Sequence, residues 1–193
     1  MKVYHGSPTK IQGDYIKPNK PFDLDSYEER VFVTEDYITA LLYCVNPIKS
    51  YFKAKGIEAD ARTFSSYIEF DKKPIKIYEL YEGFFEELFN TSAYIYISDV
   101  SNDRLTPTTS PISEYMVKEE VQIEEIIEIK DAWEELKNLL NNDKLEVVFY
   151  KDWDDKKRYI YFERNIETRA EFCKSEEELQ FFWNKFRIKG KVK

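Results

Sequence analysis

The chain has 193 residues, of which 42% are hydrophobic and 17% aromatic, and it carries a net charge of −8. This length fits one domain, or one domain with an appendage, and the apolar content is sufficient for a core. No segment approaches the ~20 apolar residues of a membrane helix, and the N-terminus lacks the apolar stretch of a signal peptide. We therefore expect a soluble, cytoplasmic protein with no membrane partner. The two cysteines, Cys44 and Cys173, lie far apart, which argues against a disulfide scaffold and against a zinc site.

Charge is distributed unevenly along the chain. Residues 1–138 contain 26 acidic and 16 basic side chains, whereas residues 139–193 contain 11 acidic and 13 basic ones. An acidic body disfavours extended nucleic-acid binding, whose affinity depends on lysine and arginine. This change of character predicts a main domain, 1–138, and a small C-terminal extension, 139–193. The basic end of the extension is a candidate surface for a protein partner.

Runs of β-branched and aromatic residues predict strands along the whole chain. In chain order they cover residues 3–5, 30–34, 67–70, 75–81, 93–97, 114–117, 121–129 and 145–150. Gly6 and Pro8 favour a tight turn directly after the first strand. The polar segment 98–112 predicts a long loop, of the kind that often carries function in a compact domain.

Apolar residues at helical spacing predict four helices. They cover residues 35–44, 83–89, 133–140 and 176–186, and residues 50–63 fit either a short helix or a loop. Thr34, Asp131 and Ser175 are the expected caps of the first, third and fourth helices. Few helices among many strands indicate an α+β fold.

The C-terminal extension combines a predicted hairpin with the last helix. Strands at 145–150 and 158–163 flank an acidic turn, and residues 171–173 are a candidate third strand. We expect the aromatic side chains of the extension to pack rather than to bind a ligand. They are Trp153, Phe182 and Trp183.

Three short stretches carry residues that suit chemistry. The first is His5-Gly6-Ser7, which holds the only histidine of the chain. The second is Val31-Phe32-Val33-Thr34, a strand that leads into a helix and places Tyr43 eleven residues after Phe32. The third is Glu114-Tyr115-Met116-Val117, which puts a carboxylate at the start of a strand, directly after the long polar loop.

In this order and spacing the three stretches resemble the ADP-ribosyltransferase superfamily, over roughly residues 3–130. The closest similarity is to the branch shared by poly(ADP-ribose) polymerases and rifampin ADP-ribosyltransferases. That branch has an N-terminal His-Gly strand, a strand aromatic followed eleven residues later by a second aromatic, and a late strand that begins with a catalytic acid. The resemblance implies two twisted, mostly antiparallel sheets that form an NAD-binding cleft. Residues 139–193 would add a hairpin-plus-helix appendage.

The resemblance also implies a role for each matching residue. His5 would hydrogen-bond the adenine-proximal ribose of NAD, and the Gly6 backbone would hold the nicotinamide amide. Phe32 and Tyr43 would sandwich the nicotinamide ring, and Glu114 would bond the 2′-hydroxyl of the nicotinamide ribose as the catalytic acid. The remaining positions expected to line the nucleotide site are Ser7, Thr34 and Ala40. NAD would be a substrate, and no metal is implied.

The chemistry explains why these residue types are needed. Cleavage of the nicotinamide–ribose bond produces an oxocarbenium-like transition state, as glycoside cleavage does. A carboxylate beside the ribose stabilises that cation, and aromatic faces clamp the flat pyridinium and exclude water. These requirements match one acid and two rings.

Three positions depart from the patterns of the resembling families. Phe32 stands where the branch has tyrosine, so it can stack but donates no hydrogen bond. Ala40 stands where many polymerase-type members have a serine, although the rifampin branch also has alanine there. Ile112 stands two residues before Glu114, where toxins that modify arginine or guanine carry Glu or Gln. The acceptor could be a protein, a nucleic acid or a small molecule, with arginine and guanine disfavoured.

Two alternatives share this fold. One is an NAD glycohydrolase, in which water is the acceptor, and the other is a catalytically reduced module that binds a nucleotide or a protein. Structural roles also compete at each position, because a lone histidine or a strand aromatic is often a core residue. The acidic neighbours of Glu114 are expected on a solvated face, and they are Glu119, Glu120, Glu124 and Glu125.

Overall fold

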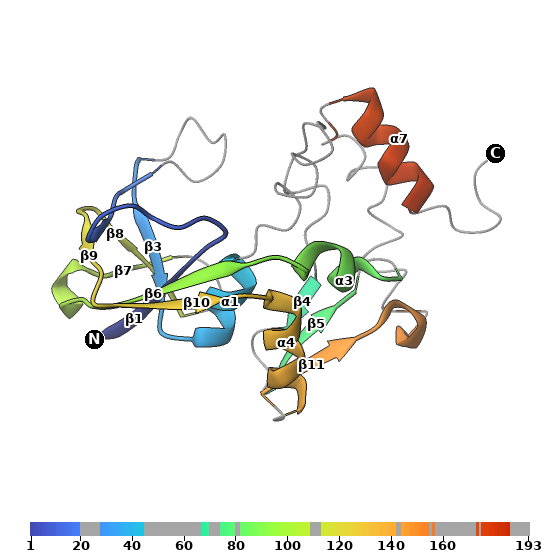
Figure 1. Cartoon of the computed structure of the whole chain (residues 1–193), viewed down its shortest axis with the longest axis horizontal. Helices are drawn as coiled ribbons and strands as arrows, with labels where there is room; N and C mark the ends of the chain where they lie inside the picture. The colour runs from blue at the N-terminus through green and yellow to red at the C-terminus, as the bar shows by residue number, and fades with distance from the viewer. Residues whose placement is uncertain are drawn as a thin grey trace. The chain divides into compact units, whose positions relative to one another are not determined.

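The structure, a computed structural model, describes residues 1–19, 28–44, 67–69, 74–79, 82–108, 113–141, 144–154, 156, 173 and 175–185. The chain forms two compact units (Figure 1). Unit 1 combines Met1–Asn46 with Thr91–Glu135, and unit 2 combines Pro47–Asn90 with Leu136–Lys193. This division differs from the expected boundary after residue 138, because residues 47–90 group with the C-terminal residues.

A six-stranded antiparallel sheet forms the centre of unit 1, with the strand order β10-β6-β1-β3-β8-β7. Its strands are β1 (Lys2–Ser7), β3 (Val31–Thr34), β6 (Ala93–Asp99), β7 (Thr106–Pro107), β8 (Glu114–Val117) and β10 (Glu125–Ile129). A short second sheet pairs β2 (Tyr15–Ile16) with β9 (Val121–Gln122). The 3₁₀ turn η1 (Asn102–Arg104) precedes β7, and the helix α1 (Tyr37–Cys44) follows β3. The described part of the chain is therefore α+β, mostly antiparallel, with few helices.

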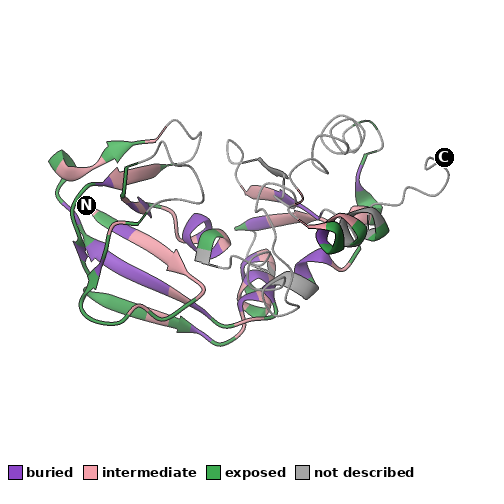
Figure 2. Ribbon diagram, turned by 90° about the horizontal axis from the view of Figure 1, so that it is seen from above, coloured by how far each residue is buried: buried purple, intermediate pink, exposed green. Residues whose placement is uncertain are grey.

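The two faces of the six-stranded sheet are covered differently. One face packs against the small β2–β9 sheet and holds an apolar cluster: Val3, Ile16, Val31, Val33, Tyr96, Val100, Val117 and Val121. We call this the core face; Figure 2 shows buried residues in purple on strands of the molecule. The other face lies against α1, which contacts β1, β3 and β6, and we call it the α1 face. There the rings of Tyr4 and Tyr37 meet edge to face, with centroids 6.0 Å apart.

Unit 2 contains a three-stranded sheet in the order β11-β5-β4. Its elements are β4 (Tyr67–Glu69), β5 (Ile75–Tyr78), α3 (Phe84–Phe89), β11 (Leu145–Val148), the 3₁₀ turn η2 (Tyr150–Asp152) and α7 (Glu176–Lys185). The helix α4 (Ala132–Asn141) runs from the end of unit 1 into unit 2. Trp153 is buried and packs edge to face on Tyr78 at 5.0 Å, which confirms its expected packing role.

Local patterns located most elements correctly. Capping hydrogen bonds confirm two of the three predicted helix caps. Asp131 accepts backbone hydrogen bonds from Trp133 and Glu134, and Ser175 accepts one from Glu178. Thr34 is not the cap of α1, because the carboxylate of Asp36 accepts the Thr39 backbone N–H at 2.7 Å. The helix therefore begins two residues later than expected.

Three further expectations need correction. β1 continues through Gly6 to Ser7 in register with β6, so the turn comes after Ser7 rather than at Gly6. Residues 121–129 form two strands, β9 and β10, instead of one. The polar segment 98–112 contains η1 and β7, so it is not loop throughout.

The structure also shows a strand pairing in the C-terminal extension that was not predicted. β11 pairs in parallel with β5, which makes it part of a sheet with residues from the middle of the chain. The predicted strand 158–163, residues 171–172 of the candidate third strand, the segment 50–63 and the basic end 186–193 lie outside the described residues. A hairpin there, and a protein partner on the basic end, stay predictions. Among the described helices, none is long and apolar enough to cross a lipid bilayer.

Candidate functional site

The pairing of β3 with β8 brings the second and third motif stretches together. Thr34 lies opposite Glu114, and Phe32 lies opposite Met116. Directly opposed residues of an antiparallel pair share a face, and residues two apart on one strand do as well. Because Tyr4 pairs with Thr34 and also packs on Tyr37 of α1, this shared face is the α1 face.

Glu114 is half-buried at the start of β8. Burial raises the pKa of its carboxyl group, and a hydrogen bond from Thr108 acts in the opposite direction. In that bond the Thr108 hydroxyl donates to Oε2 of Glu114 at 3.2 Å. The partly desolvated position favours a chemical role, because ionisable groups with shifted pKa values gather at functional sites.

Tyr43, near the end of α1, is electrostatically coupled to Glu114. Desolvation and the charge of Glu114 raise the pKa of Tyr43 to about 12. Tyr43 is nevertheless 52% exposed, so part of the residue is open to solvent. An exposed ring beside a half-buried carboxylate suits a contact with a flat ligand.

His5 is linked to β3 through a main-chain carbonyl. β1 and β3 are paired at Tyr4 and Thr34, and one step further along β1 the His5 ring bonds the carbonyl of Phe32, with Nδ1 at 2.8 Å from the oxygen. Since a carbonyl only accepts, Nδ1 carries the proton and donates it. Burial lowers the pKa of His5, so at neutral pH the ring is uncharged and Nε2 is an acceptor.

His5 does not share a face with the other motif side chains. It lies opposite Tyr96, whose buried ring belongs to the core face, and the two ring centroids are 6.2 Å apart. Phe32, Thr34 and Glu114 lie on the α1 face. The structure thus brings Phe32, Tyr43 and Glu114 to one side, and connects His5 to them through the backbone of Phe32.

The remaining predicted positions have local structural roles. The Ser7 hydroxyl donates to the carbonyl of Thr9 at 2.8 Å and accepts from its N–H at 3.2 Å, which closes the turn after β1. The Thr34 hydroxyl accepts the N–H of Asp36 at 3.1 Å. Ala40 is buried, and Gly6 is a strand residue opposite Ile95.

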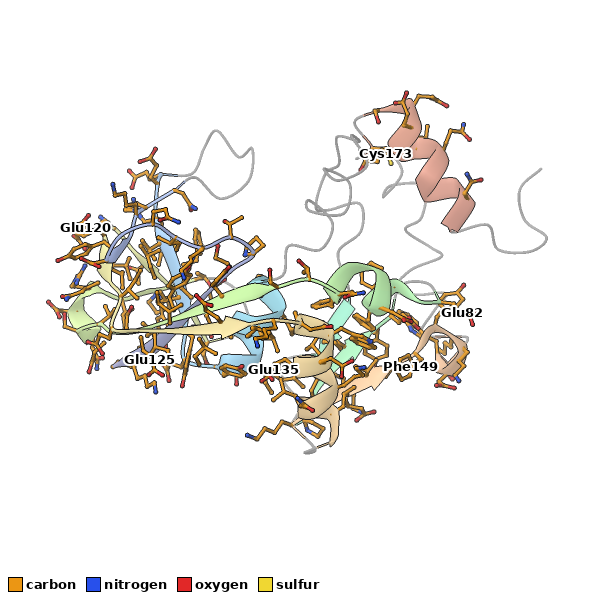
Figure 3. The ribbon with its side chains drawn as sticks, viewed as in Figure 1. Glu82, Glu120, Glu125, Glu135, Phe149 and Cys173 are labelled. Carbon is orange, nitrogen blue, oxygen red and sulfur yellow. The ribbon has the colours of Figure 1, made fainter. Side chains whose placement is uncertain are left out.

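Sequence reasoning did not single out Thr108 as a partner of Glu114. The segment around it was predicted to be part of a long polar loop, 98–112, with no role given to any single side chain. The contact depends on the pairing of β7 with β8, which is not visible in the composition of the segment. The acidic neighbours of Glu114 are exposed as expected, and Figure 3 shows Glu120 and Glu125 on the outside of unit 1.

Within the described residues, no group of three or more His, Cys, Asp or Glu side chains is placed to hold a metal ion. Comparison of the chain with protein-family models, with curated proteins and with solved structures finds no match. The assignment of a function therefore depends on the chemistry of the residues around Glu114.

Proposed function

We propose that this chain is an NAD-dependent mono-ADP-ribosyltransferase. The observation that carries the proposal is the half-buried carboxylate of Glu114, which is coupled to the exposed ring of Tyr43 and shares the α1 face with Phe32. One acid and two rings are what cleavage of a nicotinamide–ribose bond requires. The order of the three motif stretches along the chain, which resembles that superfamily, supports the same activity.

In the proposed reaction the nicotinamide ring lies against Phe32 and Tyr43, and Glu114 accepts a hydrogen bond from the ribose 2′-hydroxyl. The bond between the ribose C1′ and the nicotinamide nitrogen breaks, and its electron pair stays with nicotinamide. The carboxylate stabilises the positive charge that develops on the ribose. An acceptor then forms a bond to C1′ and loses its proton.

Gly6 would hold the nicotinamide amide, whereas His5, whose side chain lies on the core face, would support the site through the Phe32 carbonyl that it bonds. The strand position of Gly6 leaves its backbone without a side chain where the nicotinamide amide would approach. These contacts position the substrate, while the bond cleavage depends on Glu114.

The test is incubation of the protein with NAD labelled in its ADP-ribose part, together with a lysate that supplies acceptors. We expect free nicotinamide and label on an acceptor. NAD should also raise the free energy of unfolding, by ~2.7 kcal/mol at one hundred times Kd. A saturating titration with neither a thermal shift nor a calorimetric signal would refute the proposal.

A second candidate is a binding module of the same kind that has lost catalysis. Phe32 favours it, because a phenylalanine cannot donate the hydrogen bond that a tyrosine would supply. The same experiment separates the candidates. NAD binding without nicotinamide release indicates the binding module, and nicotinamide release without label transfer indicates a glycohydrolase.

A further inference from the structure

Thr108 and Glu114 are joined by two hydrogen bonds where β7 ends and β8 begins. The last registered pair of the two strands is Pro107 with Tyr115, and Thr108 follows it. The backbone N–H of Thr108 donates to the carbonyl of Glu114 at 3.0 Å. The hydroxyl of Thr108 donates to Oε2 of Glu114 at 3.2 Å. The backbone bond holds the main chain of Thr108 next to Glu114. The Thr108 hydroxyl therefore approaches Oε2 of Glu114 from a defined side.

The groups that face Glu114 from the neighbouring described elements are uncharged, so they do not compete with the Thr108 bond for its carboxylate. From α1 the titratable group facing it is Tyr43, whose phenol stays protonated because its pKa is raised to about 12. From β3 the residue opposite is Thr34, which carries no charge. On β7 the residues that precede Thr108 are Thr106 and Pro107, which are also uncharged.

Two nearby carboxylates are engaged elsewhere. Glu35 accepts the hydroxyl of Tyr115 at 2.5 Å, and Asp36 accepts the backbone N–H of Thr39 at 2.7 Å. Among the described residues, the hydrogen bond that a side chain donates to Glu114 therefore comes from Thr108.

We infer that Thr108 is a positioning residue: its hydroxyl holds Oε2 of Glu114 so that Oε1 faces the substrate. This inference rests on the proposed function, because it concerns the carboxylate assigned to the ribose. One anchored oxygen fixes the rotation of the carboxyl group and leaves the other oxygen to accept from the ribose 2′-hydroxyl. Burial raises the pKa of Glu114 and the Thr108 bond lowers it, so the same hydroxyl also keeps the carboxylate ionised.

The experiment compares Thr108→Val, which removes the hydroxyl at nearly constant shape, with Thr108→Ser, which keeps it. Thr106→Val on the exposed part of β7 is the matched control. The pKa of Glu114 is followed by carbon NMR of the carboxyl groups, with its signal assigned from Glu114→Gln. Nicotinamide release is measured against pH and against NAD concentration.

For Thr108→Val we expect the pKa of Glu114 to rise by about one unit, because a hydrogen bond to a charged acceptor is commonly worth that much. The acid limb of kcat should move upward by the same amount, and kcat on the plateau should fall by about tenfold with KM for NAD unchanged. Thr108→Ser and Thr106→Val should match the parent in every measurement.

The inference is overturned if Thr108→Val leaves the pKa of Glu114 unchanged, or if Thr108→Ser shifts it as much as Thr108→Val. If Thr108→Val does not fold, Thr108→Ala repeats the measurement with a smaller side chain. The carboxyl titration needs no turnover, so a parent protein that never releases nicotinamide refutes the proposed function while the Thr108 contact is still tested. A parent that turns over NAD, with Thr108→Val behaving identically, refutes the positioning role alone.

Discussion

The two units each contain a glutamate withdrawn from solvent, and the two carboxylates differ in their partners. Glu79 of unit 2 is 4% exposed, and its carboxylate accepts the backbone N–H groups of Gly83 at 2.8 Å and Tyr150 at 2.9 Å. Glu114 of unit 1 is half-buried and accepts the hydroxyl of Thr108 at 3.2 Å. Both carboxylate oxygens of Glu79 accept hydrogen bonds from the chain itself, whereas the hydroxyl of Thr108 bonds one oxygen of Glu114.

This difference separates a structural carboxylate from one suited to chemistry. Glu79 ties the start of α3 to η2, and its own backbone N–H extends the pairing of β5 with β11 by bonding Val148 at 2.9 Å. A buried carboxylate bonded to two main-chain donors stabilises loops, and losing it leaves those donors unsatisfied. Within the described part of the chain, the other oxygen of Glu114 accepts no hydrogen bond, and the half-exposed Tyr43 is electrostatically coupled to it.

The largest effect is expected for Glu114→Gln. The amide keeps shape and one acceptor but loses the charge that stabilises the cationic ribose, so nicotinamide release should fall by at least ~100-fold with NAD affinity little changed. Burial raises the pKa of Glu114, so the ionised carboxylate opposes folding as pH rises through that pKa, and its removal should not lower stability at neutral pH. Turnover assays and urea denaturation measure both quantities.

Glu119→Gln is the control for that variant. Glu119 is exposed five residues further along the chain, and its carboxylate pairs with Arg104 at 3.5 Å on the surface. Exposed ion pairs contribute little to stability, so this variant should match the parent in turnover and in unfolding. A silent Glu114→Gln, or an inactive Glu119→Gln, would show that the site is assigned to the wrong residue.

Glu79→Gln should lose stability without losing turnover, the reverse of Glu114→Gln. An amide has only one acceptor oxygen, so its NH₂ group would face one of the two backbone N–H donors, Gly83 or Tyr150. Because that donor loses its partner, the free energy of unfolding should fall by about 2 kcal/mol. The rate of nicotinamide release per folded molecule should not change. Denaturation midpoints and turnover at a temperature where the variant is folded provide the measurement. Lost turnover with intact stability would contradict the comparison.

A smaller effect is expected for Phe32→Tyr. The half-buried ring lies on the α1 face, and the added hydroxyl restores the group found at this position in the resembling families. NAD binding should stay the same or tighten by up to about fivefold, the worth of one neutral hydrogen bond. Calorimetric titration measures it. A large loss of stability would instead indicate a ring packed with no room for a hydroxyl.

The smallest effect concerns His5→Asn and pH. Burial lowers the pKa of His5, so below about pH 6.5 the unfolded chain binds more protons than the folded one, and stability falls as the pH drops through that window. Asparagine keeps an N–H donor for the Phe32 carbonyl but does not titrate. Urea denaturation at pH 7 and pH 5 should show a smaller loss for the variant, and equal losses would contradict a desolvated His5.

The elements themselves could be predicted from the sequence because local patterns specify them. The strand β8 was predicted with the bounds that the structure has, Glu114–Val117, and Asp131 was predicted as the cap of α4. The exposure of the acidic neighbours of Glu114 was also predicted from the sequence. The start of α1 was misplaced, since Thr34 and Asp36 are both good caps and sequence pattern does not choose between neighbouring ones.

The sequence by itself therefore determined the segments and the order of the three motif stretches. Only the tertiary structure decided which side chains meet. Strand register places Glu114 opposite Thr34 and His5 opposite Tyr96, and a slip of one residue would move each to the other face. The parallel pairing of β11 with β5, the Thr108–Glu114 bonds and the burial of Glu79 likewise depend on contacts between different segments of the chain. Such contacts follow from the packing of the whole chain, which no local pattern encodes.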